Sequence, residues 1–131
     1  GRGECEWKSS GMMNRGSDFT GLTRLQVEAL LECFDFLHNG YVPFCDFETD
    51  GKWIIKLHHK KNGNWIVVTI MTDCYRISIN GKTRKSVMMR EGPERYRLFV
   101  NSDMSVGVVR TSPGADVGVI PGSLSTNNDA R

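Results

Sequence analysis

Residues 52–70, KWIIKLHHKKNGNWIVVTI, contain the pattern that decides the fold. Hydrophobic and polar residues alternate on both sides of Asn62 and Gly63, a pair of residues that favours the two-residue turn of a β-hairpin. The segment therefore predicts two antiparallel strands, with histidines and lysines gathered close to the turn.

A two-residue turn fixes which residues of the two strands face each other, and it places Leu57 opposite Val68. Because side chains alternate between the faces of a strand, the hairpin has one core face and one basic face. The core face contains Trp53, Ile55, Leu57, His59, Ile66, Val68, Ile70 and Thr72. The basic face contains Ile54, Lys56, His58, Lys60, Trp65, Val67 and Thr69.

A helix is predicted for residues 24–38. Thr23 and Gln26 have the spacing of a capping box, and Asn39-Gly40 supplies a stop. Apolar residues recur at helical spacing and form one stripe, which contains Val27, Leu30, Leu31, Phe34 and Leu37.

A second hairpin is indicated by residues 75–87, YRISINGKTRKSV. A two-residue turn at Asn80-Gly81 would place charged residues opposite Ile77 and Ile79, where an apolar core does not accept them. We therefore expect a longer loop or a bulge. In either case the second arm would project as a mobile basic loop that carries Lys82, Arg84 and Lys85.

The remaining segments complete an α+β fold. RYRLFV and SVGVVR read as two strands around residues 101–103, and one more short strand is expected near Val117. We expect one N-terminal helix packed on a twisted antiparallel sheet of five to six strands. Residues 21–120 would form a single domain, after an irregular or flexible segment 1–20 and before a disordered tail 121–131.

Composition narrows the class of protein. The chain has 131 residues, 39% hydrophobic and 24% charged, which suits one globular domain. The sequence has no apolar run near the roughly 20 residues of a membrane-spanning helix, so no membrane association is expected. The first residue is Gly, and we expect a domain cut from a larger parent protein that is monomeric when isolated.

The four cysteines form no C-x-x-C pair; they are Cys5, Cys33, Cys45 and Cys74. This spacing favours reduced thiols and an intracellular, cytoplasmic protein. We expect no metal ion and no cofactor. Cys45 with His58 or His59 could form a thiol nucleophile and its base, but the sequence does not show that they lie close together.

Charge is unevenly distributed along the chain. Residues 52–97 carry 11 basic and 3 acidic groups, whereas residues 1–51 carry 4 basic and 9 acidic groups. Phosphates of a nucleic acid would neutralise the basic loops. The residues expected to contact them are Lys60, Lys61, Lys82, Arg84 and Lys85. The alternative is that these lysines protect sheet edges or serve solubility.

Aromatic and acidic residues alternate between the helix and the first hairpin, in GYVPFCDFETDGKW. Two aromatic rings can hold a flat cationic ring between them, and carboxylates can accept hydrogen bonds from its edge. The segment could equally be an ordinary loop. Its acids lack the Gly and Glu positions of an EF-hand calcium loop.

This combination of a helix, a small antiparallel sheet, loop and hairpin aromatics and nearby acids resembles the cap-binding domains in polymerase proteins of segmented negative-strand RNA viruses. The resemblance covers roughly residues 20–110. It implies that two aromatic rings hold the methylated guanine of an mRNA cap and that carboxylates bind the guanine edge. Carried over to this chain, the rings are Phe44 or Phe47 with Trp53 or Trp65, and the carboxylates are Asp46, Glu48 or Asp50.

The leading hypothesis is a non-catalytic module of a larger, viral-polymerase-like protein that binds RNA or a cap-like nucleotide. It would use aromatic stacking and a basic hairpin surface. The alternative is a protein-interaction domain whose basic finger meets an acidic partner. A Cys/His enzyme is the weakest of the three interpretations.

Overall fold

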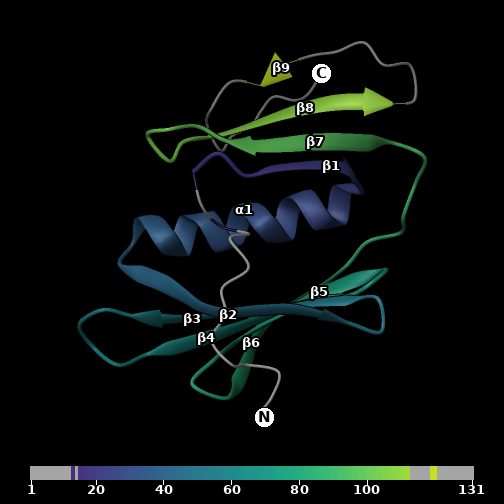
Figure 1. Cartoon of the computed structure of the whole chain (residues 1–131). Coiled ribbons are helices and arrows are strands. Elements are labelled where there is room, and N and C mark those ends of the chain that lie inside the picture. The colour runs from purple at the N-terminus through teal and green to yellow at the C-terminus, as the bar shows by residue number, and fades with distance from the viewer. Residues whose placement is uncertain (1–12, 14, 113–118, 121–131) are drawn as a thin grey trace.

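The computed structural model of the chain describes residues 13, 15–112 and 119–120 (Figure 1). In this part of the chain, helix α1 (Arg24–His38) lies between two antiparallel sheets. One sheet has the order β1 (Asp18–Leu22), β7 (Arg95–Val100), β8 (Val106–Ser112) and β9 (Val119–Ile120). The other has the order β2 (Tyr41–Thr49), β3 (Lys52–His59), β4 (Trp65–Ile70), β5 (Cys74–Ile79) and β6 (Lys82–Met88).

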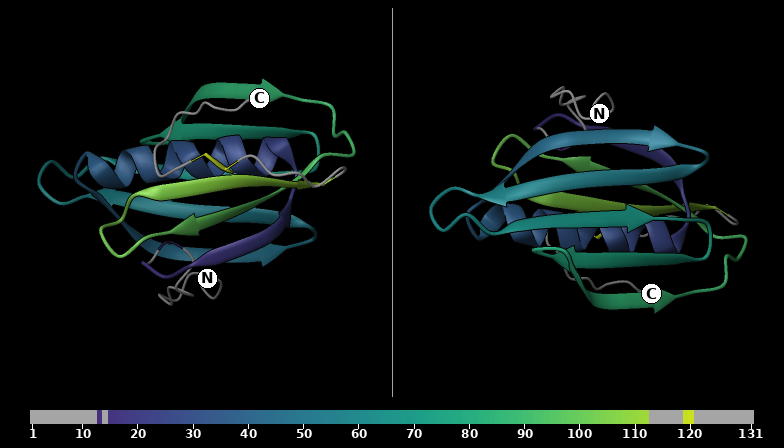
Figure 2. Two further views of the ribbon diagram at one scale, coloured as in Figure 1. Left: turned by 90° about the horizontal axis from the view of Figure 1, so that it is seen from above. Right: turned by 90° about the horizontal axis from the view of Figure 1, so that it is seen from below.

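The α+β class is confirmed, but the strands form two sheets rather than one. Figure 2, seen from above and from below, shows the helix crossing between them. The reason is a second apolar stripe on α1: Leu25, Ala29 and Cys33, four residues apart, are buried along with Leu30 and Phe34. A helix that is apolar on two sides needs cover on both.

The predicted helix bounds are confirmed. The Thr23 side chain accepts a hydrogen bond from the Gln26 backbone N–H, and the Gln26 side chain accepts one from the Thr23 N–H. This capping box satisfies two donors that the first turn leaves without helical partners. Asn39 ends the helix, and Gly40 follows with a φ of +98°.

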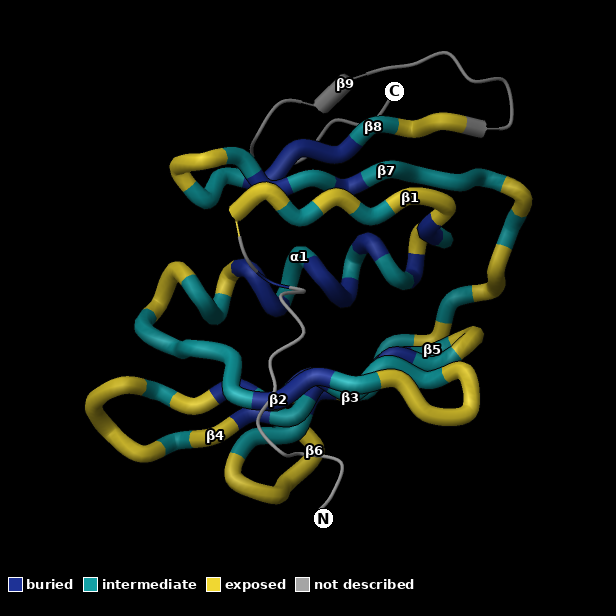
Figure 3. The backbone as a smooth tube through the Cα atoms, in the orientation of Figure 1, coloured by how far each residue is buried: buried dark blue, intermediate teal, exposed yellow. Residues whose placement is uncertain are grey.

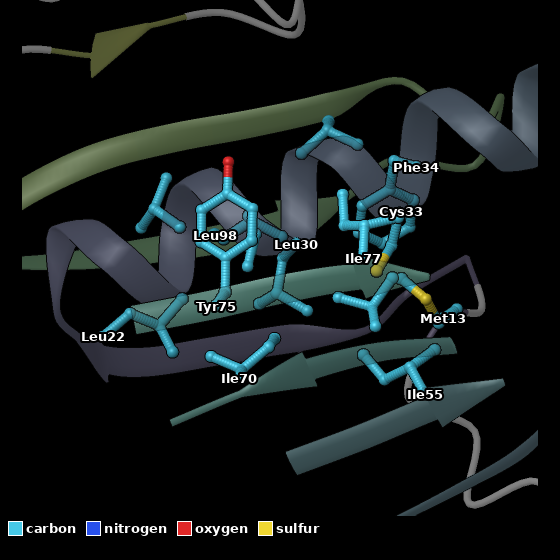
Figure 4. Packing of buried hydrophobic residues seen from close by; sticks show 14 of the residues in the cluster. Met13, Leu22, Leu30, Cys33, Phe34, Ile55, Ile70, Tyr75, Ile77 and Leu98 are labelled. Carbon is cyan, nitrogen blue, oxygen red and sulfur yellow. The ribbon is translucent and has the colours of Figure 1, made fainter. Parts of the chain in front are cut away.

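The core fills the space between each sheet and the helix. Figure 4 shows Ile55, Ile70 and Ile77 of the five-stranded sheet and Leu98 of the four-stranded sheet, together with side chains of α1. Figure 3 shows that burial concentrates on the helix and on the strand segments next to it. One continuous core therefore supports both sheets.

The β3–β4 hairpin has the predicted faces but not the predicted partners. Leu57 faces Ile66, and Val68 faces Ile55, so the expected Leu57–Val68 pairing is wrong. The observed register differs from the predicted one by two residues. The cause is a four-residue loop, residues 60–63, which is closed by the His59 backbone N–H donating to the Asn64 carbonyl (2.8 Å). A slip of two leaves every side chain on its predicted face.

The segment expected as an aromatic and acidic loop is a strand. β2 pairs with β3 along its length, through a tight turn in which Asp50 and Gly51 have φ values of 51° and 74°. The pairing shifts between Pro43 and Cys45, so Phe44 is the extra residue of a bulge. Proline is tolerated here because β2 is the edge of the sheet.

The β5–β6 hairpin does form the two-residue turn, with Asn80 and Gly81 at φ values of 51° and 87°. The expected bulge is present: Ile77 faces Lys85 and Ser78 faces Thr83, which leaves Arg84 as the extra residue. The expectation of a mobile projecting loop is wrong, because Lys82–Met88 is a strand paired to β5. Its side chains are nevertheless mostly exposed.

The chain ends are described only in part. β1 begins at Asp18, where the sequence predicted an irregular segment up to residue 20. The strands predicted at RYRLFV and SVGVVR are confirmed as β7 and β8. The expected strand at Val117 and tail 121–131 lie outside the described residues. In the described part, no helix has the length and apolar character needed to cross a membrane.

Candidate nucleic-acid interface

The five-stranded sheet has one face against α1 and one face turned away from it, which we call the outer face (Figure 2, seen from below). Strand alternation and the pairing registers decide which side chains lie there. They are Val42, Cys45, Phe47, Thr49, Lys52, Ile54, Lys56, His58, Trp65, Val67, Thr69, Cys74, Arg76, Ser78, Thr83, Ser86 and Met88. None of these strand residues is an aspartate or a glutamate.

Three rings follow one another across one end of the outer face, and we call them the aromatic row. The ring of Phe44, which the bulge of β2 presents, lies 5.4 Å from the ring of His58 at an angle of 60°. His58 directly faces Trp65 on the next strand. Trp65 is 42% exposed, which is unusual for so large an apolar side chain. The row therefore presents flat apolar surface to solvent.

The turn of the neighbouring hairpin supports Trp65. A Cβ atom on Gly81 would lie 3.8 Å from Cη2 of the indole, so the ring passes close over the turn. The backbone N–H of Trp65 donates to Oδ1 of Asn80 (2.9 Å), and the backbone N–H of Asn80 donates to the Trp65 carbonyl (2.9 Å). Nδ2 of Asn80 also donates to Oδ1 of Asn64 (2.9 Å), which ties the two hairpins together.

Basic groups lie at the same end of the sheet as the aromatic row. Lys60 and Lys61 occupy the β3–β4 loop, Lys82 begins β6, and Arg84 is the bulge residue of β6; all four are exposed. The two hairpin turns meet at this end because β3 and β5 run in the same direction. Four of the five predicted phosphate contacts are thus brought together.

Lys85 has a different role from the one predicted. Its Nζ donates to Oε2 of Glu32 on α1, and the Tyr75 hydroxyl donates to the same oxygen (2.8 Å). Burial, followed by this hydrogen bond, raises the pKa of Tyr75. Lys85 therefore joins β6 to the helix, and its charge acts on the fold.

Two further cations lie in the middle of the outer face. Nζ of Lys56 stands 6.0 Å from the ring centroid of Phe47, and Arg76 is exposed on β5. The sequence pattern places Lys56 and His58 on the basic face but does not by itself mark them as site residues. The signal that identifies them is strand alternation, which puts them on the same face as Trp65.

The predicted cap clamp is split between the two sides of the sheet. Phe47 lies on the outer face, whereas Trp53 points to the helix side and lies 6.5 Å from Phe19 of the other sheet. Phe44 and Trp65 share the outer face, but the His58 ring stands between them. These two rings lie side by side on a sheet, which is not the geometry of a clamp.

The predicted carboxylates lie away from the aromatic row. Asp46 is 5% exposed on the helix side, opposite Ile55, and Glu48 faces Trp53 on that same side. Asp50 is in the β2–β3 turn, at the far end of β3 from His58, about 20 Å away along six residues of strand. The residues that the resemblance assigns to the guanine edge are therefore not next to the aromatic row.

The cysteines described by the structure are poorly placed for catalysis. Burial raises the pKa of Cys33, and the Cys45 side chain is only 1% exposed. His59 uses its Nδ1 to accept backbone hydrogen bonds. Among the described residues, no three histidines, cysteines or carboxylates gather as a metal site would require.

Comparisons with known proteins give no relative from which a function could be transferred. The chain matches no protein-family model, and neither curated proteins nor solved structures show significant similarity to it.

Proposed function

We propose that this chain is a non-catalytic module that binds single-stranded RNA on the outer face of its five-stranded sheet. The observation that supports the proposal most is the composition of that face: exposed rings and several cations, without a carboxylate among its strand residues. Bases stack on aromatic side chains, and lysines and arginines neutralise the phosphates between them.

The arrangement of the rings supports a single strand rather than a duplex. Phe44, His58 and Trp65 come from three adjacent strands, which are spaced about 4.8 Å apart. Only unpaired bases can lay their faces on such rings. Lys60 and Lys61 lie in the loop next to the row, and Lys82 begins β6 at the same end of the sheet, where a backbone that follows the stacked bases would pass.

A cap-like nucleotide remains a special case of the proposal. Stacking of a methylated guanine on Trp65 or Phe44 is compatible with the row. Its edge would find no carboxylate there, because Asp46 and Glu48 lie on the opposite face of the sheet and Asp50 lies in the distant β2–β3 turn. We therefore expect a capped RNA to bind no more tightly than the same RNA without a cap. The cysteine spacing, which contains no C-x-x-C pair and favours reduced thiols, supports a reducing, cytoplasmic setting within a larger parent protein.

The experiment is a titration of the protein with an oligoribonucleotide of about ten nucleotides, followed by tryptophan fluorescence at several salt concentrations. Stacking should quench Trp65, and the affinity should fall as the salt concentration rises. Parallel arms use the same RNA with a cap, the RNA as a duplex, and an acidic peptide.

Three outcomes contradict the proposal as stated. No binding of any RNA at low salt removes RNA binding altogether. Tighter binding of the acidic peptide favours the protein-interaction alternative. A strong preference for the capped RNA restores the cap-binding hypothesis and requires carboxylates to move to the row. The variant Trp65→Ala identifies the quenched indole, because Trp7 and Trp53 remain in it.

A further inference from the structure

His59 ends β3 with its side chain on the helix side of the sheet, and its imidazole holds the loop that carries Lys60 and Lys61. Nδ1 accepts a hydrogen bond from the Lys61 N–H (3.1 Å) and a second from the Asn62 N–H (3.3 Å). Two donors that point into the loop are thereby satisfied by one side chain.

The imidazole is itself held from two directions. The Tyr41 ring meets it edge to face, with centroids 4.8 Å apart. On another side it lies against Gly40, where a Cβ atom would come within 2.6 Å of Nε2. Gly40 is therefore the residue that leaves room for the ring, and its carbonyl also accepts from the Lys60 N–H (3.0 Å).

These hydrogen bonds determine which tautomer of the neutral His59 ring is present. A nitrogen that accepts two hydrogen bonds carries no proton, so neutral His59 must have its hydrogen on Nε2. A proton on Nδ1 would set donor against donor and would leave both loop N–H groups without this acceptor. The adjacent histidines thus have separate tasks, since His58 belongs to the aromatic row and His59 to the loop.

We infer that His59 is a positioning residue for RNA binding, which holds Lys60 and Lys61 beside the aromatic row so that their charges meet the phosphates. The inference rests on the proposed function. It assigns to the imidazole a contribution that it makes through the lysines, because its own ring lies on the opposite side of the sheet from the row.

The test compares two substitutions of His59. His59→Phe keeps a ring against Tyr41 but removes the acceptor, whereas the side-chain oxygen of His59→Asn lies close to the former position of Nδ1. In the Phe variant, the slope of log affinity against log salt should flatten by about 0.7 to 1.4, the value for one or two phosphate contacts on a single strand. The Asn variant should retain most of the wild-type slope.

A cycle with the lysines separates positioning from a general loss of structure. If His59 acts through Lys60 and Lys61, then adding His59→Phe to the Lys60→Ala/Lys61→Ala variant should weaken RNA binding no further, within about twofold. A further loss that multiplies the first overturns the inference. So does a His59→Phe variant with unchanged affinity and unchanged salt slope.

Two measurements without RNA keep the inference testable if a variant does not fold or the wild-type protein binds no RNA. Nuclear magnetic resonance of the wild-type protein should show the Nε2–H tautomer of His59, and the opposite tautomer overturns the inference. Amide exchange of Lys61 and Asn62 should be faster in His59→Phe than in His59→Asn. Absence of RNA binding by the wild-type protein counts against the proposed function, while these two results still report on the loop.

Discussion

The outer faces of the two sheets use similar residues in different ways. On the four-stranded sheet, the guanidinium of Arg97 lies 4.7 Å from the ring centroid of Phe99 and donates two hydrogen bonds of 2.9 Å to the carboxylate of Asp18. Phe99 in turn covers Gly107, where a Cβ atom would lie 2.3 Å from the ring. The charge is neutralised and the ring is packed.

On the five-stranded sheet, Lys56 stands over Phe47 and Trp65 is exposed, but the strand residues of that face include no carboxylate. A cation and a ring thus form a closed structural cluster on one sheet and an open surface on the other. Aromatic and basic residues therefore indicate a ligand only where the protein itself does not neutralise the charge.

The largest expected effect on stability comes from the core between the helix and the two sheets. Leu57 is fully buried, so Leu57→Ala should lower the free energy of unfolding by about 2–5 kcal/mol, through lost burial and a cavity. Lys60→Ala, in the exposed loop, is the matched control and should be nearly neutral. Thermal or denaturant unfolding measures both, and similar midpoints for the two variants would mean that Leu57 is not in the core.

The second prediction separates the faces directly. Trp65→Ala should weaken RNA binding by about 1–3 kcal/mol, the contribution of one stacked base, with little change in stability. Phe99→Ala on the other sheet should leave RNA affinity unchanged and lower stability, because it uncovers Gly107. Titrations and melting curves of both variants check the comparison. Equal losses of affinity would show that the two faces are not functionally different.

The third prediction applies the same distinction within β6. Lys82→Ala should flatten the salt dependence of RNA binding by about 0.7, the value for one phosphate contact, without loss of stability. Lys85→Ala should leave that slope unchanged and reduce stability by up to about 1 kcal/mol, because Lys85 pairs with Glu32 at the surface. The reverse pattern would assign the ligand contact to Lys85.

The smallest effect concerns the closed cluster. The hydrogen bonds from Arg97 hold the pKa of Asp18 below its ordinary value of 3.8, so ionised Asp18 contributes stability that is lost as the pH falls through its lowered pKa. Asp18→Asn should therefore cost about 0.2–1 kcal/mol at neutral pH and nothing in strong acid. Unfolding measured at both pH values tests this, and a constant difference would contradict it.

The elements with local signals could be predicted from the sequence. The capping box at Thr23 and the stop at Asn39-Gly40 set the helix bounds, and alternation set the faces of β3 and β4. The partners within that hairpin could not be predicted, because the His59 side chain stabilises a four-residue loop instead of the two-residue turn. A loop that is stabilised by one side chain has no periodic pattern in the sequence from which its length could be predicted.

Non-local features were harder to foresee. β2 was mistaken for a loop because Pro43 and a bulge interrupt its pairing and because Asp46 is buried on the helix side, where alternation predicts an apolar residue. The second sheet was missed because the small residues Ala29 and Cys33 weaken the second stripe of α1. The grouping of Phe44, His58 and Trp65 depends on three strands being side by side, which a single segment cannot indicate.

The bulges in β2 and β6 also affect the behaviour of the protein in concentrated solution. Both are the edge strands of the same sheet; β2 has Pro43 beside its bulge, and the bulge residue of β6 is Arg84. Irregular pairing, proline and positive charge at an edge oppose the addition of a strand from another molecule. The sheet can thus keep an exposed aromatic row while its edges oppose growth into filaments, and the proposed RNA would approach the row across the face rather than along an edge.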